Sequence, residues 1–179
     1  NTTLFMQSLG FSAKNTYNRY LFEESSPVSN LFLGLKYMLE RDGKDKASTY
    51  FAEVNRFGDT VLLENQAYLP LGFLANSQLA DLEFNVTDNG FDFQNRLFSA
   101  ATGVNGQVWH RIENFRIFGD GVNVFEENGQ GYCKYDSTVD KGDLTYSFTA
   151  ETDGFFCVQL DLPKRNDFYL SVNGVELYK

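Results

Sequence analysis

The sequence predicts an α+β protein, in which a small mixed α/β part is followed by an antiparallel β-sandwich of the jelly-roll type. Aromatic residues make up 16% of the chain, and aromatic and β-branched side chains favour half-buried strands. Helical spacing of apolar residues is confined to the first part, whereas turn signals recur at short intervals from Val108 onward. We therefore expect a mixed α/β subdomain over residues 1–104 and a β-sandwich subdomain over residues 105–179.

Three segments of the first subdomain carry helix signals. Residues 15–22 predict one or two helical turns. A serine cap near Pro27 opens the next helix, in which apolar residues follow at helical spacing over residues 28–35. Residues 91–101 predict an amphipathic helix that ends at Gly103.

Strand signals lie between these helices. Residues 37–40 either continue the preceding helix or begin a strand, and the charged residues 41–48 predict a loop. Residues 50–54 and 61–65 predict a hairpin, because a Gly-Asp turn separates them. Residues 71–75 are a further strand candidate.

The second subdomain shows the alternation that is typical of half-buried strands. Apolar side chains occupy every second position in three runs, at residues 144–150, 156–162 and 168–172. Glycine-containing turns separate these runs. Several short antiparallel strands at this spacing favour a β-sandwich.

Charge and hydropathy exclude some classes of partner. The formal net charge of -9 makes nucleic acid an unfavourable partner, because an acidic chain repels phosphate. It also disfavours peripheral binding to anionic lipid. No apolar run approaches the length that crosses a bilayer. Cys133 and Cys157 are too far apart for a zinc site, and they are either joined as a disulfide or, as we favour, buried as small apolar side chains.

No residue pattern indicates catalysis, and we predict no catalytic residue, metal ion or cofactor for this chain. The single histidine, His110, has no nucleophile in a recognisable motif beside it. No candidate carboxylate pair of the glycosidase type lies in a distinctive sequence motif, and phosphate-binding glycine motifs are missing. Asp120, Asp140 and Asp143 lack the ordered spacing of a calcium loop.

Aromatic side chains are the most promising binding residues. Flat rings stack on the apolar faces of sugars, so surface tryptophan and tyrosine are typical of glycan sites. The candidates are Trp109, Tyr68, Tyr132 and Tyr135, and Tyr169 is a further ring of this kind. The alternative, which we favour for most of them, is a place in the core or on a sheet.

Three segments in order resemble the extracytoplasmic region of the YfhO family of bacterial multi-spanning membrane proteins. The first contains Gly34-x-Lys36-Tyr37. The second contains Glu64-Asn65 followed by Leu-Pro-x-Gly-Phe over residues 69–73. The third contains Asn95-x-Leu97 and ends in Thr-Gly at residues 102–103. The second segment is the most specific of the three.

The resemblance implies a function that composition does not reveal. Such proteins resemble membrane glycosyltransferases that take sugars from polyprenyl-phosphate carriers and modify polymers of the Gram-positive cell envelope. The catalytic acid of such enzymes lies near the first membrane helices, so no catalytic residue transfers to this chain. We expect the chain to be part of a longer protein, on the extracytoplasmic face of the bacterial cell membrane.

Two functions follow from the resemblance. The chain is expected to be a non-catalytic domain that positions or recognises a cell-envelope glycan or polymer acceptor. A basic patch of Lys36, Arg41, Lys44 and Lys46 is a weak candidate for an anionic polymer. The alternative is a structural domain that packs on the transmembrane portion of the parent protein without binding sugar. An exposed apolar patch favours the second function, and a concave groove lined by Trp109 or tyrosines favours the first.

Overall fold

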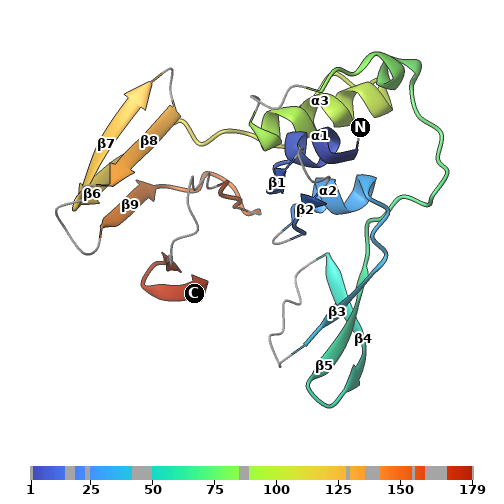
Figure 1. Ribbon diagram of the computed structural model, residues 1–179, viewed down its shortest axis with the longest axis horizontal. Coiled ribbons are helices and arrows are strands. Elements are labelled where there is room, and N and C mark those ends of the chain that lie inside the picture. Colours follow the sequence, from blue (N-terminus) through green and yellow to red (C-terminus); the bar gives the residue numbers. More distant parts are fainter. Residues whose placement is uncertain are drawn as a thin grey trace.

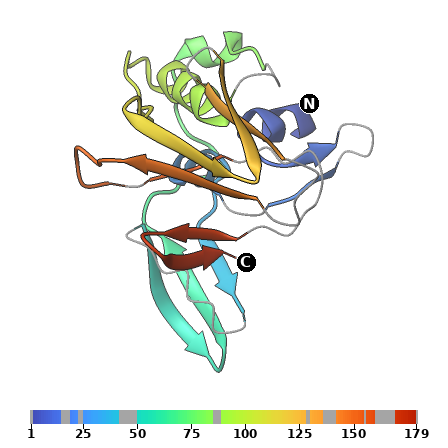
Figure 2. The same cartoon turned by 90° about the vertical axis from the view of Figure 1, so that its left-hand side faces the viewer.

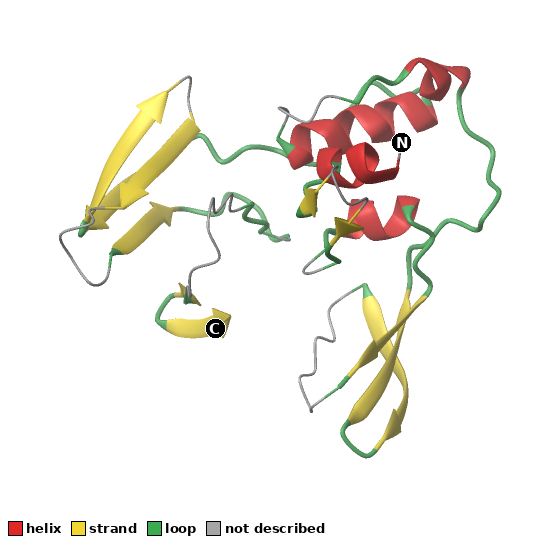
Figure 3. Ribbon diagram, in the orientation of Figure 1, coloured by secondary structure: helices red, strands yellow, loops and turns green. Residues whose placement is uncertain are grey.

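A computed structural model confirms the α+β class: short helices and antiparallel strands intermingle up to residue 102, and the described elements after that residue are strands (Figure 1, Figure 3). The structure describes residues 2–14, 19–22, 25–41, 50–84, 89–127, 130–135, 142–154, 156–159 and 169–178. Within these, the side chains of Lys14 and of residues 124–127, 130–135 and 176–178 are not described.

The helices of the N-terminal half pack around one apolar core. They are α1 (Thr2–Ser8), α2 (Pro27–Phe32), the 3-10 helix η2 (Ser77–Asp81) and α3 (Gly90–Thr102). Two short strands, β1 (Ala13–Lys14) and β2 (Arg19–Tyr20), pair antiparallel beside α1. The core consists of buried apolar side chains from α1, the residues that follow it and α3, namely Met6, Leu9, Phe11, Phe93 and Leu97.

The predicted serine cap of α2 and the predicted end of α3 at Gly103 are confirmed, whereas α2 ends at Phe32, before the predicted residue 35. Ser26 caps α2 in a capping box, since its hydroxyl accepts from the Ser29 amide and the Ser29 hydroxyl accepts from the Ser26 amide. The Asn89 side chain accepts from two amides of the first turn of α3. Gly103 ends α3 in the left-handed region, with φ 72°.

A three-stranded antiparallel sheet projects away from the helices (Figure 1, Figure 2). It contains β3 (Tyr37–Glu40), β4 (Phe51–Phe57) and β5 (Thr60–Asn65), with β5 in the centre. One face forms a second core from Phe51, Val61 and Leu63. The predicted hairpin is therefore β4–β5, and the segment that follows α2 is a strand rather than a continued helix.

The carboxamide of Gln94 joins four parts of the helical half. It is almost fully buried in α3. Its Oε1 accepts from the Ser26 hydroxyl at 2.6 Å and from Trp109 Nε1 at 2.8 Å, and its Nε2 donates to the Leu9 carbonyl at 3.0 Å. One side chain thus connects the end of α1, the cap of α2, α3 and the chain that leaves α3.

Asn95, the next residue of α3, fixes the same outgoing chain. Its Oδ1 accepts from the amides of Val108 and Trp109, and its Nδ2 donates to the Trp109 carbonyl. Ser99, one turn later, donates to the Gly106 carbonyl. The segment after α3 therefore folds back along the helix, although it has no regular secondary structure of its own.

The C-terminal part consists of antiparallel pairs among the described strands. β6 (Phe115–Asp120) pairs with β9 (Asp143–Phe148), and β7 (Val122–Glu127) pairs with β8 (Gln130–Tyr135). β10 (Leu170–Val172) and β11 (Val175–Tyr178) form a hairpin at a turn in which Asn173 and Gly174 both have positive φ. Whether these pairs form a sandwich, and whether a domain boundary lies near residue 104, stay predictions.

Three local expectations differ from the structure. Residues 19–20 form β2 rather than a helical turn, and residues 15–18 lie outside the described part. Residues 71–75 form a loop, although their apolar run has the composition of a strand. Residues 156–159 are irregular as well, and residues 160–162 are not described. Apolar content alone does not supply the partner strand that a ladder requires.

Replacing Gln94 tests the central hydrogen-bond network. Gln94→Ala leaves the Trp109 indole N–H, the Ser26 hydroxyl and the Leu9 carbonyl without this partner. We expect a loss of about 2–4 kcal/mol in the free energy of unfolding, measured by urea titration. The exposed Gln78 of η2 is the matched control, for which Gln78→Ala changes stability by less than about 0.5 kcal/mol. Equal stabilities of the two variants contradict this role.

A second test concerns the close approach of α3 to the end of α1. A Cβ on Gly90 would lie 2.8 Å from the Cα of Gly10 and 2.8 Å from Oε1 of Gln159, which accepts from the Gly90 amide. Gly90→Ala is therefore expected to lower the free energy of unfolding by about 1–3 kcal/mol. Gly72→Ala, where no atom lies within 4 Å of the added methyl, serves as the control. A thermal melt of Gly90→Ala that coincides with the wild type would refute the contact.

Candidate functional site

Four polar and aromatic residues lie close together where the link from α2 meets the three-stranded sheet. Lys36 Nζ lies 5.0 Å from the ring centre of Tyr37 and 5.3 Å from that of Tyr68. It also lies 3.7 Å from a carboxylate oxygen of Glu64. We call Lys36, Tyr37, Glu64 and Tyr68 the tyrosine–lysine cluster. It contains one of the four sequence-predicted glycan-binding residues, Tyr68, and one lysine of the predicted basic patch.

Buried backbone and amide contacts hold this cluster in place. Asn65 at the end of β5 is almost fully buried. Its Nδ2 donates to the Leu35 carbonyl at 2.9 Å, its backbone amide donates to the Lys36 carbonyl at 2.7 Å, and its Oδ1 accepts from the Ala67 amide. Tyr37 and Glu64 face each other in the β3–β5 register. Gly34 makes the preceding turn with φ 64°, and an added Cβ there would lie 3.1 Å from the Leu69 carbonyl.

The cluster combines a fixed positive charge with exposed rings. Tyr37 is 52% exposed and Tyr68 is 39% exposed, so both rings have open area. Hydrogen bonding to Tyr37 foremost, with Tyr68 adding to it, raises the pKa of Lys36 above its ordinary value. The ammonium group therefore stays charged throughout the physiological pH range. Glu64 offsets part of this charge at one side.

This arrangement suits a polar ligand with flat apolar faces. Each ring offers a surface on which the CH groups of a sugar can stack, and the phenol hydroxyls and Lys36 offer hydrogen bonds at its edge. The cluster has no nucleophile paired with a base.

Trp109 is held by contacts with α3 through both its indole and its backbone. Its indole N–H donates to Gln94, and its ring packs 5.2 Å from the ring centre of Phe91. Its backbone is held at both the amide and the carbonyl by Asn95. The side chain is half-buried, and its one hydrogen-bond donor is already used. Trp109 and Tyr68 lie in separate loop segments, and no described contact joins them.

The other two candidate rings lie on β8. Tyr132 pairs with Phe125 and Tyr135 pairs with Val122 in the β7–β8 register. Their side chains are outside the described part of the structure. Their role in glycan binding stays a prediction.

The remaining chemical candidates are dispersed. His110 is exposed in the segment between α3 and β6. Asp120 and Asp143 face each other at the end of the β6–β9 ladder, and Asp140 is not described. Among the described residues, no three histidine, cysteine or carboxylate side chains group as metal ligands.

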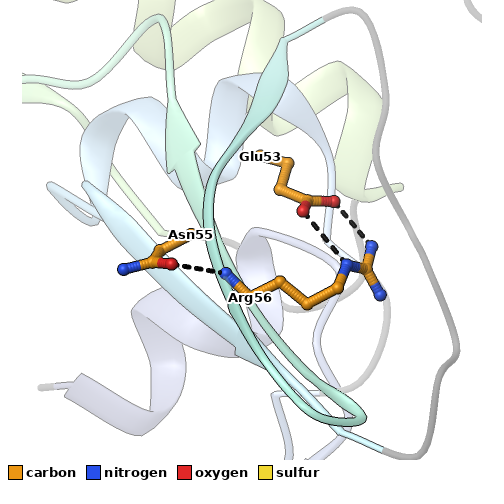
Figure 4. A network of polar contacts seen from close by, with 3 residues as sticks. All are labelled: Glu53, Asn55 and Arg56. Carbon is orange, nitrogen blue, oxygen red and sulfur yellow. Dashed lines mark hydrogen bonds and ion pairs between the residues drawn. The ribbon is translucent and has the colours of Figure 1, made fainter.

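A charged pair on β4 is already engaged. Arg56 donates to both carboxylate oxygens of Glu53, at 2.6 and 3.1 Å, and its backbone amide donates to Asn55 Oδ1 (Figure 4). Both side chains are well exposed, so the pair contributes little to stability. Arg56 is thus less available to an anionic ligand than its exposure alone suggests. Of the predicted basic patch, Lys44 and Lys46 are outside the described residues.

Sequence reasoning did not single out Tyr37 and Glu64 as partners of Tyr68. Tyr37 was visible only as part of Gly34-x-Lys36-Tyr37, and Glu64 only as part of the second resembling segment. The β3–β5 register, which opposes Tyr37 to Glu64, brings these two segments together. A strand assignment for residues 37–40 together with this pairing would have revealed the cluster.

Cys157 is the one half-buried residue of the segment 156–159, and it provides a test of how that segment is placed. Cys157 is a free thiol, and burial raises its pKa. A raised pKa means less thiolate at a given pH, and thiolate is the reactive form. In a Cys133→Ser background, Cys157 is expected to react with iodoacetamide at pH 8 several-fold more slowly than free cysteine, and to reach the free rate in urea. A native rate equal to that of free cysteine at each pH contradicts this burial.

The comparison with known families gives the class of the protein first. A family model described as "Bacterial membrane protein YfhO" matches residues 1–179, so the class is that of bacterial membrane proteins. The chain belongs to the YfhO family. No curated protein and no solved structure matches it. In the described part of the chain, no helix is both long and apolar enough to cross a membrane.

Proposed function

We propose that this chain is a non-catalytic extracytoplasmic domain of a glycosyltransferase-like membrane protein, and that it recognises or positions a cell-envelope glycan acceptor. The observation that carries the proposal is the tyrosine–lysine cluster, where two exposed rings flank one cation. Membership of a bacterial membrane-protein family supports the location at the cell membrane. The bond-forming chemistry then belongs to the transmembrane portion of the parent protein, which is the expected partner.

The charge distribution supports the same site. The chain is acidic overall, with a net charge of -9, which opposes the approach of an anionic polymer. Lys36 supplies a positive charge between stacking surfaces, and its contacts with Tyr37 and then Tyr68 raise its pKa above the ordinary value. A glycan can therefore be held through ring stacking, while Lys36 accommodates a hydroxyl or an acidic substituent on it.

Binding of cell-envelope glycan fragments to the purified chain tests this function. Each removed ring takes away a stacking surface, so Tyr37→Ala with Tyr68→Ala is expected to weaken affinity at least about tenfold in calorimetry. Lys36→Met should lower the affinity for acidic glycans more than the affinity for neutral ones. Tyr20→Ala removes a ring that is also 46% exposed, on β2, and is the matched control. A wild-type chain that binds no envelope glycan, or a double variant that binds as the wild type does, overturns the proposal.

A second function is supported by the outer face of the sheet. Leu39 and Phe57 are 63% and 67% exposed. Their partners Leu62 and Thr60 lie two and four positions before Glu64, the partner of Tyr37, so all these side chains lie on one face of the sheet. An apolar sheet face of this kind suits packing on the transmembrane portion of the parent protein. In that case Leu39→Ser with Phe57→Ser lowers the amount of parent protein in membranes and leaves glycan affinity unchanged.

A further inference from the structure

Two leucines of the loop between β5 and η2 stand free of the rest of the protein. Leu71 and Leu74 have relative exposures of 105% and 103%, which means that no other residue covers either side chain. Phe73 between them is 39% exposed. We call residues 69–75 the apolar loop. Exposed leucines are common singly, but two fully exposed ones within four positions form a feature that needs an explanation.

The ends of the apolar loop are fixed, so the leucines are presented at a defined place. The Leu69 amide donates to the Leu31 carbonyl of α2 at 3.3 Å. The ring of Phe73 meets that of Phe32 edge to face, with centres 6.3 Å apart. At the far end the Asn76 amide donates to the Ala101 carbonyl of α3 at 2.7 Å. The loop is thus attached to two helices at its ends and in its middle, while Leu71 and Leu74 remain outside.

The charge pattern around the loop differs from that of the whole chain. Residues 65–80 contain no charged side chain, although charged residues make up 22% of the protein and the net charge is -9. A lipid surface with anionic head groups repels an acidic protein, and it repels an uncharged segment least. The apolar loop can therefore approach lipid without an electrostatic penalty of its own.

We propose that the apolar loop inserts Leu71 and Leu74 into the surface of the lipid bilayer. The family is one of membrane proteins, so a bilayer surface is within reach of the parent protein. A stable protein interface takes about 800 Å² from each partner, which two leucines and part of a phenylalanine do not supply. A bilayer accommodates single apolar side chains, because each is transferred from water into the acyl boundary independently. This contact goes beyond glycan recognition and does not depend on it.

Insertion of this kind has a defined dependence on lipid and salt. Because the loop is uncharged, binding to vesicles of phosphatidylcholine should change little with ionic strength. Because the remaining surface is acidic, addition of phosphatidylglycerol should weaken binding at low salt, and high salt should restore it. Electrostatic binding would instead become stronger with phosphatidylglycerol and weaker with salt.

Flotation of the purified 179-residue chain with such vesicles tests the proposal. Leu71→Ser with Leu74→Ser is expected to lower the vesicle-bound fraction at least about tenfold in partition coefficient. Val104→Ser with Val175→Ser removes two apolar side chains that are 57% and 63% exposed elsewhere, and it should leave partitioning unchanged. Leu71→Trp should strengthen binding, because tryptophan favours the membrane interface. Circular dichroism melts of all variants should coincide with the wild type, since no side chain packs on these leucines.

Three results overturn the proposal. The first is a wild-type chain and a Leu71→Trp variant that both stay unbound at high lipid concentration, which would point to a protein partner for the loop. The second is equal partitioning of the wild type and of Leu71→Ser with Leu74→Ser. The third is binding that needs phosphatidylglycerol and is lost at high salt, because such binding arises from charge.

Discussion

The helical half of this protein depends on one buried carboxamide, that of Gln94. A buried amide must find partners for both its oxygen and its nitrogen, because each unpaired group loses its hydration without replacement. Gln94 meets this requirement with Leu9, Ser26 and Trp109, which come from three other segments of the chain. The orientations of α1, α2 and α3 relative to one another are therefore fixed by polar geometry as well as by the apolar core of Met6, Leu9, Phe11, Phe93 and Leu97.

The same constraint acts a second time at Asn65 and creates the tyrosine–lysine cluster. Asn65 is buried, and its side chain forms hydrogen bonds with Leu35 in the link between α2 and β3 and with Ala67 in the loop after β5. Lys36 and Tyr37 come directly after Leu35 in the sequence, and Tyr68 comes directly after Ala67. Their positions therefore depend on the hydrogen bonds of the Asn65 side chain. The three segments that resemble the family thus contain two kinds of residue. Asn65, Gln94 and Asn95 are buried and hold the structure together, whereas Tyr37 and Tyr68 are exposed.

The two proposed contacts come from one short stretch of chain. Tyr68 belongs to the tyrosine–lysine cluster, and Leu71 and Leu74 belong to the apolar loop that follows immediately. If the loop rests on lipid, a glycan on the cluster lies close to the membrane surface, where a membrane-bound acceptor or its polymer would be found. The acidic remainder of the surface then faces the aqueous phase, which is consistent with the charge-free composition of residues 65–80.

The sequence by itself determined the α+β class, the serine cap of α2, the end of α3 at Gly103, the β4–β5 hairpin and the family, because these depend on local spacing, capping residues and motif order. It did not determine α1, the β2 strand or the loop at residues 71–75, because short segments adopt the structure that their neighbours permit. Only the tertiary structure decided the site. It showed that the indole of Trp109 donates to Gln94 and packs on Phe91, and it made Tyr37 a candidate through the β3–β5 register. Long-range pairing brings such residues together, and no local pattern encodes it.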